Sequence, residues 1–182
     1  ATDLPVLLYN IPVRTGRLIE LDTIKRLAET PNIIGVKDAT GNVDMAARIS
    51  RETAGDFILY SGEDRLNLQL AREAGAVGAI SVASHWAGQG LRILYDALAD
   101  DNQPLAQLTN DYLEPSYDFE SGSDTPNPIP AKAILRAIGV PVGYCRPPMI
   151  PKNMDEHWRT VEADLEHRGG RIHQELQDQL TA

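Results

Sequence analysis

A lysine and a tyrosine stand at corresponding places in two consecutive segments of the sequence. Lys37 is the first polar residue after the apolar run at 33–36, and Tyr9 is the first residue with a polar group in the run at 5–9, which it ends. If both runs are parallel strands, their carboxyl ends meet at one edge of the sheet, where functional groups gather in such folds. The pattern predicts that Lys37 and Tyr9 are neighbours at one rim, with the Lys37 amine directed toward the Tyr9 hydroxyl.

These two residue types can together form an imine with a carbonyl compound. Imine formation needs a free amine, whereas an unperturbed lysine, with a pKa of about 10.4, is protonated at neutral pH. A low-dielectric site at the end of a buried strand lowers such a pKa, and a tyrosine hydroxyl can move protons at the carbinolamine stage. Their positions in the sequence are also compatible with a structural role, in which Lys37 is a surface lysine at a strand end and Tyr9 is an aromatic residue of the core or rim.

Other residues near the strand ends also have a functional and a structural interpretation. Arg14, in the segment after Tyr9, could clamp a substrate carboxylate through two hydrogen bonds or be a solvated loop arginine. Gly62 could let the backbone approach a ligand or form a plain turn. Three acidic residues are predicted to cap helices: Asp38, Glu63 and Asp64.

The remaining reactive side chains have no pattern that predicts a site. Cys145 has no evident base beside it in the sequence, and we interpret it as inert. No metal-ligand spacing with nearby carboxylates occurs around the four histidines, which are His85, His157, His167 and His173. We therefore expect no metal and no cofactor.

Four apolar runs predict the strands that position these residues. They lie at 5–9, 33–36, 57–60 and 77–82 and are continuous rather than alternating, as is typical of strands buried on both faces of a parallel sheet. Segments with helical spacing separate them, for example Leu21, Ile24 and Leu27. The alternation of strand and helix predicts an α/β fold with parallel strands and right-handed crossovers.

After about residue 100 the sequence is predicted to be mostly helical. Helices are expected at 104–114, 129–138 and 155–168, with a polar loop at 117–127 and an extended segment at 140–151. The Gly169-Gly170 pair is predicted to break the last helix. We therefore divide the chain into 1–100, with four strand–helix units, and 101–182, a helical C-terminal region.

The composition is that of an ordinary globular chain. It has 182 residues, 42% hydrophobic and 24% charged, with a formal net charge of −9 that weighs against a nucleic-acid partner. One cysteine excludes an internal disulfide and a Cys-based zinc site. No apolar run approaches the ~18 residues of a membrane span, and no signal peptide pattern is present. We expect a cytoplasmic protein without a membrane partner.

Two longer motifs carry a family resemblance. Residues 9–16 read YNIPVRTG and residues 35–42 read GVKDATGN. They resemble the tyrosine and lysine motifs of the pyruvate-dependent Schiff-base lyase/aldolase family, which is typified by dihydrodipicolinate synthase. Three shorter segments match in order and spacing: SGED at 61–64, GAISV at 78–82 and NPIPAK at 127–132. The resemblance covers about residues 4–151.

This resemblance implies a role for each matching residue. Lys37 matches the family's imine lysine, and Tyr9 matches its proton-relay tyrosine. Arg14 matches the arginine that binds the carboxylate of the second substrate in the synthase branch. Gly62 and Ile80 match positions whose backbone lines the pyruvate pocket.

The resemblance also implies an activity. Enzymes of the synthase branch condense pyruvate with L-aspartate 4-semialdehyde to 4-hydroxy-tetrahydrodipicolinate, in lysine and diaminopimelate biosynthesis, and the family forms homotetramers. The Arg-Thr-Gly triplet at 14–16 favours this branch. It does not exclude a 2-keto-3-deoxy sugar-acid aldolase or an N-acetylneuraminate aldolase of the same family.

The sequence departs from the family because it starts at what would be the fifth of eight strands. We expect the C-terminal half, strands 5–8, of a (β/α)8 TIM barrel followed by a helical tail. The inward-facing side chains would then lack their opposing strands; these are expected to be Leu7, Ile34, Leu59 and Ile80. The paired threonines that hold the pyruvate carboxylate would also be missing. A truncated, inactive chain is therefore a third interpretation.

Overall fold

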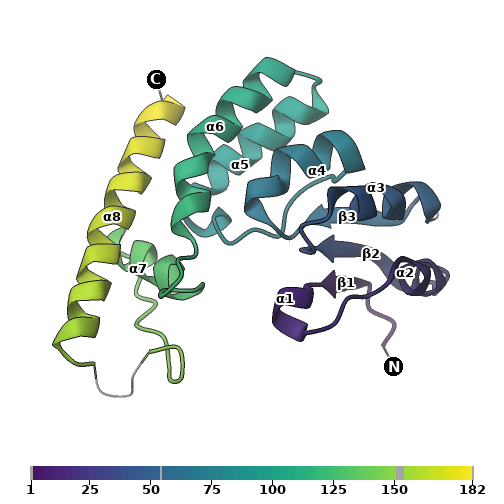
Figure 1. The fold of residues 1–182 in the computed structure, drawn as a ribbon. Coiled ribbons are helices and arrows are strands. Elements are labelled where there is room, and N and C mark those ends of the chain that lie inside the picture. Colours follow the sequence, from purple (N-terminus) through teal and green to yellow (C-terminus); the bar gives the residue numbers. More distant parts are fainter. Residues whose placement is uncertain (1, 54, 151–153, 182) are drawn as a thin grey trace. The chain divides into compact units, whose positions relative to one another are not determined.

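A computed structural model describes residues 2–53, 55–150 and 154–181 of the chain (Figure 1). Two compact units make up the chain, Ala1–Ser81 and Val82–Ala182. The sequence predicts a division into 1–100 and 101–182, and this predicted boundary lies later in the chain than the boundary between the two units. The difference arises because α5 (Ser84–Ala99) packs against α6 (Gln103–Phe119) in the second unit.

The first unit is an α/β structure around a parallel sheet, as predicted. Its strands β1, β2 and β3 pair in that order, and β2 is parallel to both neighbours. A helical segment or two follows each strand. The elements in chain order are β1 (Val6–Asn10), α1 (Pro12–Thr15), α2 (Leu21–Ala28), β2 (Ile33–Asp38), α3 (Val43–Glu52), β3 (Ile58–Ser61), the 3₁₀ turn η1 (Asp64–Leu66) and α4 (Asn67–Ala74).

The segment at 77–82, predicted as a fourth strand, forms only an isolated parallel bridge between Ser61 and Ala79. Its pairing with β3 consists of three hydrogen bonds: Val77 N to Leu59 O, Ser61 N to Gly78 O, and Ile80 N to Ser61 O. No strand among the described residues pairs with its other side. The segment therefore has the parallel alignment of a strand without the length of one.

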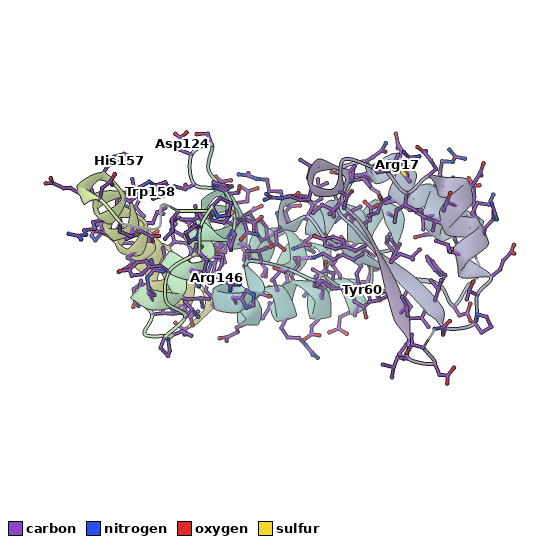
Figure 2. The ribbon with its side chains drawn as sticks, turned by 90° about the horizontal axis from the view of Figure 1, so that it is seen from below. Arg17, Tyr60, Asp124, Arg146, His157 and Trp158 are labelled. Atoms are coloured by element: carbon purple, nitrogen blue, oxygen red, sulfur yellow. The ribbon has the colours of Figure 1, made fainter. Side chains whose placement is uncertain are left out.

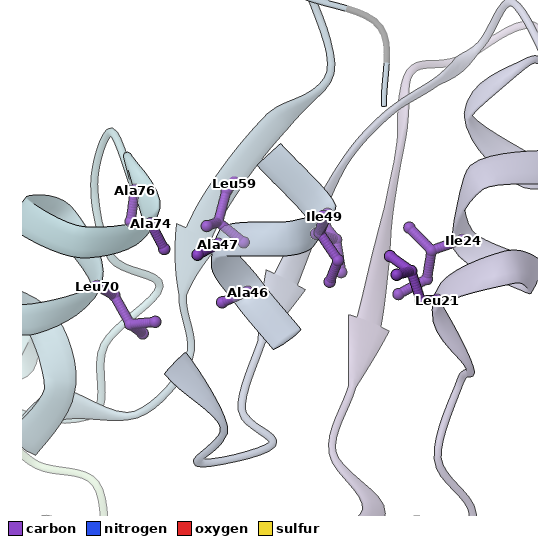
Figure 3. Close-up of a cluster of buried hydrophobic side chains, with 10 residues drawn as sticks. Leu21, Ile24, Ala46, Ala47, Ile49, Leu59, Leu70, Ala74 and Ala76 are labelled. Atoms are coloured by element: carbon purple, nitrogen blue, oxygen red, sulfur yellow. The ribbon is translucent and has the colours of Figure 1, made fainter. Parts of the chain in front are cut away.

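The two faces of the sheet differ in burial, contrary to the prediction that both are buried. Val36 and Leu59 are 0% and 2% exposed and belong to a core shared with α2, α3 and α4 (Figure 3). Leu7 and Tyr9, on the opposite face, are 36% and 46% exposed. The assignment of Leu59 to the inward face is therefore wrong, because its position in the alternation of β3 turns it toward the helices.

The second unit is helical, with α5 packed against α6, and α7 (Ile129–Ala137) packed against α8 (Glu156–Thr181). The predicted end of α6 near residue 114 is wrong, since the helix continues through Pro115 to Phe119. Leu113 and Tyr117, on either side of this proline, are buried, and their packing offsets the lost hydrogen bond. In the ranges that the structure describes, no helix is both long and apolar enough for a membrane span.

The predicted helix break at Gly169-Gly170 is also wrong, because α8 runs without interruption from Glu156 to Thr181. Gly169 is buried against α7. A Cβ atom there would lie 2.8 Å from the Cβ and 3.1 Å from the Cα of Ile134. This glycine is needed for the close approach of two helices rather than for ending one of them.

We predict that alanine substitutions at the two adjacent glycines change stability in opposite directions. Alanine favours a helix over glycine by about 1 kcal/mol, and Gly170→Ala gains this because its Cβ would lie 3.6 Å from the Ala137 Cβ, an ordinary contact. Gly169→Ala must push α7 and α8 apart, at a cost of about 1–3 kcal/mol. Urea unfolding followed by circular dichroism measures both, and midpoints that shift in the same direction would contradict the packing argument.

Candidate functional site

Lys37 and Tyr9 lie side by side on the open face of the sheet. The strand register pairs Tyr9 with Lys37 directly, so both side chains leave the same face at the same level. The Lys37 Nζ lies 4.1 Å from the centroid of the Tyr9 ring, within the range of a cation–π contact. The predicted proximity at one rim is confirmed. The amine, however, lies over the ring face, whereas the expectation directed it at the hydroxyl.

Gly62 makes room for the Lys37 side chain. A Cβ at this position would lie 2.9 Å from each of three atoms: the Lys37 Cε, the Asp38 carbonyl oxygen and the Ala39 Cβ. The Gly62 N–H donates a 2.7 Å hydrogen bond to the same Asp38 oxygen, which fixes the close approach. The absence of a side chain at Gly62 therefore makes room for Lys37, and the approach of its backbone to a ligand stays a prediction.

Ile80 follows Ala79, which forms the isolated bridge with Ser61, and lies on the open face one position beyond that bridge. Its N–H donates a 2.9 Å hydrogen bond to Ser61 O, and its side chain is 42% exposed. Since Ser61 pairs with Ala79, Gly62 and Ile80 both stand one position further along their segments. The two residues thus face the same side as Lys37, above its level.

Arg14 lies in α1, the single helical turn that begins two residues after β1 ends. Its side chain is exposed, and it forms no ion pair or hydrogen bond with another side chain in the described part of the chain. The turn is held by Gly16, at φ 68°, whose N–H donates to Pro12 O. Arg17 is a second exposed arginine in the loop that follows (Figure 2). The structure therefore places Arg14 at the edge where the strands end, with its guanidinium available.

A row of buried polar residues, missed by the sequence analysis, supports the site from the helix side. Asn10, Asp38 and Ser61 pair across the three strand ends and are 0%, 1% and 0% exposed. Asn10 anchors the loop after α1 through two hydrogen bonds with the backbone of Ile19, 3.0 and 3.1 Å long. The period of two along a strand could have revealed this row, since each member follows Tyr9, Lys37 or Tyr60.

Asp38 does not cap a helix, contrary to the prediction. Its Oδ1 accepts hydrogen bonds from the Thr40 backbone N–H and hydroxyl, at 3.2 and 2.8 Å. The cap of α3 is Asn42, whose side chain accepts from Met45 N. Burial raises the pKa of the Asp38 carboxyl above its usual value, while the two hydrogen bonds from Thr40 oppose this effect. The carboxyl lies inside the protein because it ends a strand on the face that the helices cover.

Tyr60 is a second residue that the sequence analysis did not assign to the site. It pairs with Lys37 across β2 and β3, so the alternation of side chains along the strands turns both toward the same face at the same level. The signal was present, because Tyr60 ends an apolar run as Tyr9 does. Lys37 therefore stands between two tyrosines on neighbouring strands.

No group of three metal-binding side chains lies together within the described residues. Cys145 is buried, and this burial raises the pKa of its thiol, which favours the unreactive protonated form. The chemistry of the open face therefore consists of an amine, two phenols and an exposed guanidinium nearby. An amine with an adjacent phenol is the pair that imine formation with a carbonyl compound uses.

Comparison with known proteins gives one consistent result. The Dihydrodipicolinate synthetase family matches residues 1–168. A 4-hydroxy-tetrahydrodipicolinate synthase of Nostoc punctiforme is 41% identical over 164 residues, which are 90% of this chain and 51% of the relative. The chain thus spans about half the length of the curated relatives that it matches.

Solved structures agree with this result. A dihydrodipicolinate synthase of Bacillus anthracis has a TM-score of 0.79 at 37% identity, covering 91% of this chain and 55% of that one. The enzyme of Acinetobacter baumannii, solved in complex with pyruvate, has a TM-score of 0.78 at 32% identity, covering 93% and 57%.

We predict that the contribution of Asp38 to stability falls as the pH rises. Because its folded pKa is raised, the folded chain binds more protons than the unfolded chain between the ordinary value of about 3.9 and the folded pKa, and the free energy of unfolding falls through this window. Asp38→Asn removes the titration. The free energy of unfolding of the variant should therefore rise relative to the parent chain between pH 3 and pH 7.

Urea unfolding at a series of pH values measures this difference. Asp3→Asn is the control, since Asp3 is exposed near the N-terminus and its carboxylate stays in water. A pH dependence that is the same in Asp38→Asn and in the parent chain would show that the buried carboxyl has no such effect.

Proposed function

This chain belongs to the dihydrodipicolinate synthetase family, and we propose that it supplies the lysine that binds pyruvate in a 4-hydroxy-tetrahydrodipicolinate synthase. The reaction would condense pyruvate with L-aspartate 4-semialdehyde. The single observation that carries the proposal is the Lys37 amine over the Tyr9 ring, 4.1 Å from its centroid, on the open face of a parallel sheet.

Lys37 would act as the nucleophile. Its amine attacks C2 of pyruvate, and the carbinolamine that forms loses its hydroxyl as water to give the imine. Loss of a proton from C3 then gives an enamine, whose C3 forms the new carbon–carbon bond with the aldehyde. The amino group that came from the semialdehyde then attacks C2 of the imine and displaces the Lys37 amine, which closes the ring and returns the free lysine. Gly62 supports this role because it leaves space for the Lys37 stem, whose Cε would lie 2.9 Å from a Cβ at this position.

Tyr9 would move the protons. The carbinolamine hydroxyl leaves only if it gains a proton, and the pronucleophile at C3 must lose one. A phenol can give and take these protons when it lies within hydrogen-bond reach. The direct pairing of Tyr9 with Lys37 in the sheet supports this role.

Arg14 would bind the second substrate. L-aspartate 4-semialdehyde carries a carboxylate, which a guanidinium can hold through two parallel hydrogen bonds. The exposed Arg14 side chain, in the turn that follows Tyr9, supports this assignment. Gly62 and Ile80 would line the pyruvate pocket from the other side of Lys37.

The whole enzyme would be a (β/α)8 barrel to which this chain contributes strands five to eight and a helical C-terminal region. The open face of the sheet, with Leu7 and Ile80 36% and 42% exposed, supports a larger assembly. A barrel of this type needs about 250 residues and removes the open edges of the sheet. We refer to this barrel as the assembled enzyme, and we propose that it is a cytoplasmic homotetramer. The chain alone would be inactive.

We predict that borohydride in the presence of pyruvate modifies Lys37 irreversibly in the assembled enzyme. The reductant converts the imine to a secondary amine, which peptide mass mapping assigns to one residue. Lys37→Arg should abolish the modification, because a guanidinium does not lose its proton near neutral pH.

Lys25→Arg is the matched control for this experiment. Lys25 lies on α2 and pairs with Glu52 at 2.9 Å, so its replacement should leave the modification unchanged. An adduct mapped to Lys25, Lys132 or Lys152 would reject the assignment of Lys37. Turnover of sugar acids in place of the semialdehyde would reject the synthase branch and support an aldolase.

We predict that Arg14→Ala impairs use of the semialdehyde far more than imine formation with pyruvate. Loss of a charge-assisted hydrogen bond to a carboxylate costs roughly 1.5–3 kcal/mol, or about 10- to 150-fold in kcat/KM for the semialdehyde. Arg17→Ala is the control, because Arg17 is also an exposed arginine near this turn. Its replacement should have little effect on kcat/KM for the semialdehyde. Equal losses in both half-reactions of Arg14→Ala would contradict the proposed role.

A further inference from the structure

Four residues stand at one level of the open face. Tyr9, Lys37 and Tyr60 pair in register across β1, β2 and β3. Gly78 continues this row, because the bridge between Ser61 and Ala79 places the preceding residues, Tyr60 and Gly78, opposite each other. Lys37 thus has an aromatic neighbour on each side within the row.

Gly78 holds the ring of Tyr60 in place. A Cβ at Gly78 would lie 3.1 Å from Cε1 and 3.3 Å from Cδ1 of this ring, so the ring packs directly on the glycine backbone. Tyr60 is half-buried there. Because Gly78 lies across β3 from Lys37, the ring lies against the far side of the row and cannot move further away from the amine.

Within the sheet, a carbon chain bonded to the Lys37 amine has a neighbour on either side. The ring of Tyr9 fills the β1 side, with its centroid 4.1 Å from Nζ. On the β3 side, Gly62 and Gly78 have no side chains, and Gly62 lies close to the Lys37 stem. Among the described residues, Tyr60 is therefore the side chain that pairs with Lys37 in register on this side.

We propose that the ring of Tyr60 is the wall that limits the size of the 2-oxo acid that Lys37 accepts. This inference rests on the proposed function, in which a 2-oxo acid forms an imine with Lys37. The ring leaves space for the methyl group of pyruvate and excludes a longer chain, such as the ethyl group of 2-oxobutyrate. Tyr60 is a specificity-determining residue that acts through its shape.

A comparison of pyruvate with 2-oxobutyrate tests the proposal. The assembled enzyme is treated with borohydride and pyruvate or 2-oxobutyrate, and the initial rates of adduct formation are measured by mass spectrometry. Tyr60→Ala should raise the ratio of the 2-oxobutyrate rate to the pyruvate rate by at least about tenfold, since one methylene in a fitted pocket is worth roughly 10- to 200-fold. Val77→Ala, a control in the neighbouring segment with an exposed side chain, should leave the ratio unchanged.

Gly78→Ala provides a change in the opposite direction. The added methyl group pushes the Tyr60 ring toward Lys37, so the ratio should fall below that of the parent enzyme. If Tyr60→Ala does not fold, as judged by a cooperative thermal transition, Tyr60→Leu replaces it, and a rise in the ratio of severalfold is then the expected result.

The outcomes separate this inference from the function on which it rests. Absence of any pyruvate adduct in the parent enzyme would overturn the proposed function and the wall together. A parent enzyme that traps pyruvate, with an unchanged ratio in Tyr60→Ala or in its replacement Tyr60→Leu, would overturn the wall alone. A rise in Tyr60→Phe as large as in Tyr60→Ala would assign the selectivity to the hydroxyl and would also overturn the argument from shape.

Discussion

The parallel, in-register pairing of three strands is the constraint on which the site depends. It places Tyr9, Lys37 and Tyr60 in one row, although they are distant in the sequence. A shift of one residue would turn Lys37 toward the helices and Asp38 toward the open face. Such a shift is costly, because it would bury the amine of Lys37 against the helices and expose the apolar side chain of Val36, which is 0% exposed in the observed register.

The part of the site that local patterns encode could be predicted from the sequence. Lys37 and Tyr9 each end an apolar run, and the rule that parallel strands end at one edge was enough to bring them together. The contact between the Lys37 amine and the Tyr9 ring could not be predicted from the sequence. It depends on the conformation of the Lys37 side chain, for which Gly62 leaves space because it has no Cβ. Tyr60 ends an apolar run as Tyr9 does, so the same pattern could have predicted its place in the row.

The incorrect predictions of the fold share one cause, which is that tertiary packing overrides the local preference of a residue. Pro115 and the Gly169-Gly170 pair are helix breakers by propensity. The helix α6 nevertheless continues through Pro115, because the residues on either side of it are buried. Gly169 is required where α8 packs closely against Ile134 of α7. The continuous apolar runs likewise concealed that one face of the sheet packs on helices and the other is open. Which face is covered depends on the crossovers that place α2, α3 and α4 on one side of the sheet, and the sequence of a single strand does not contain that information.

The most direct test of the account is a crystal structure of the assembled enzyme after reduction with borohydride in the presence of pyruvate. Imine formation at Lys37 predicts continuous density from the Lys37 Nζ to C2 of the bound group, with the group between the rings of Tyr9 and Tyr60 and its carbon chain below Gly62 and Ile80. Density for an unmodified Lys37, or for an adduct that points away from the row of Tyr9, Lys37 and Tyr60, would contradict it.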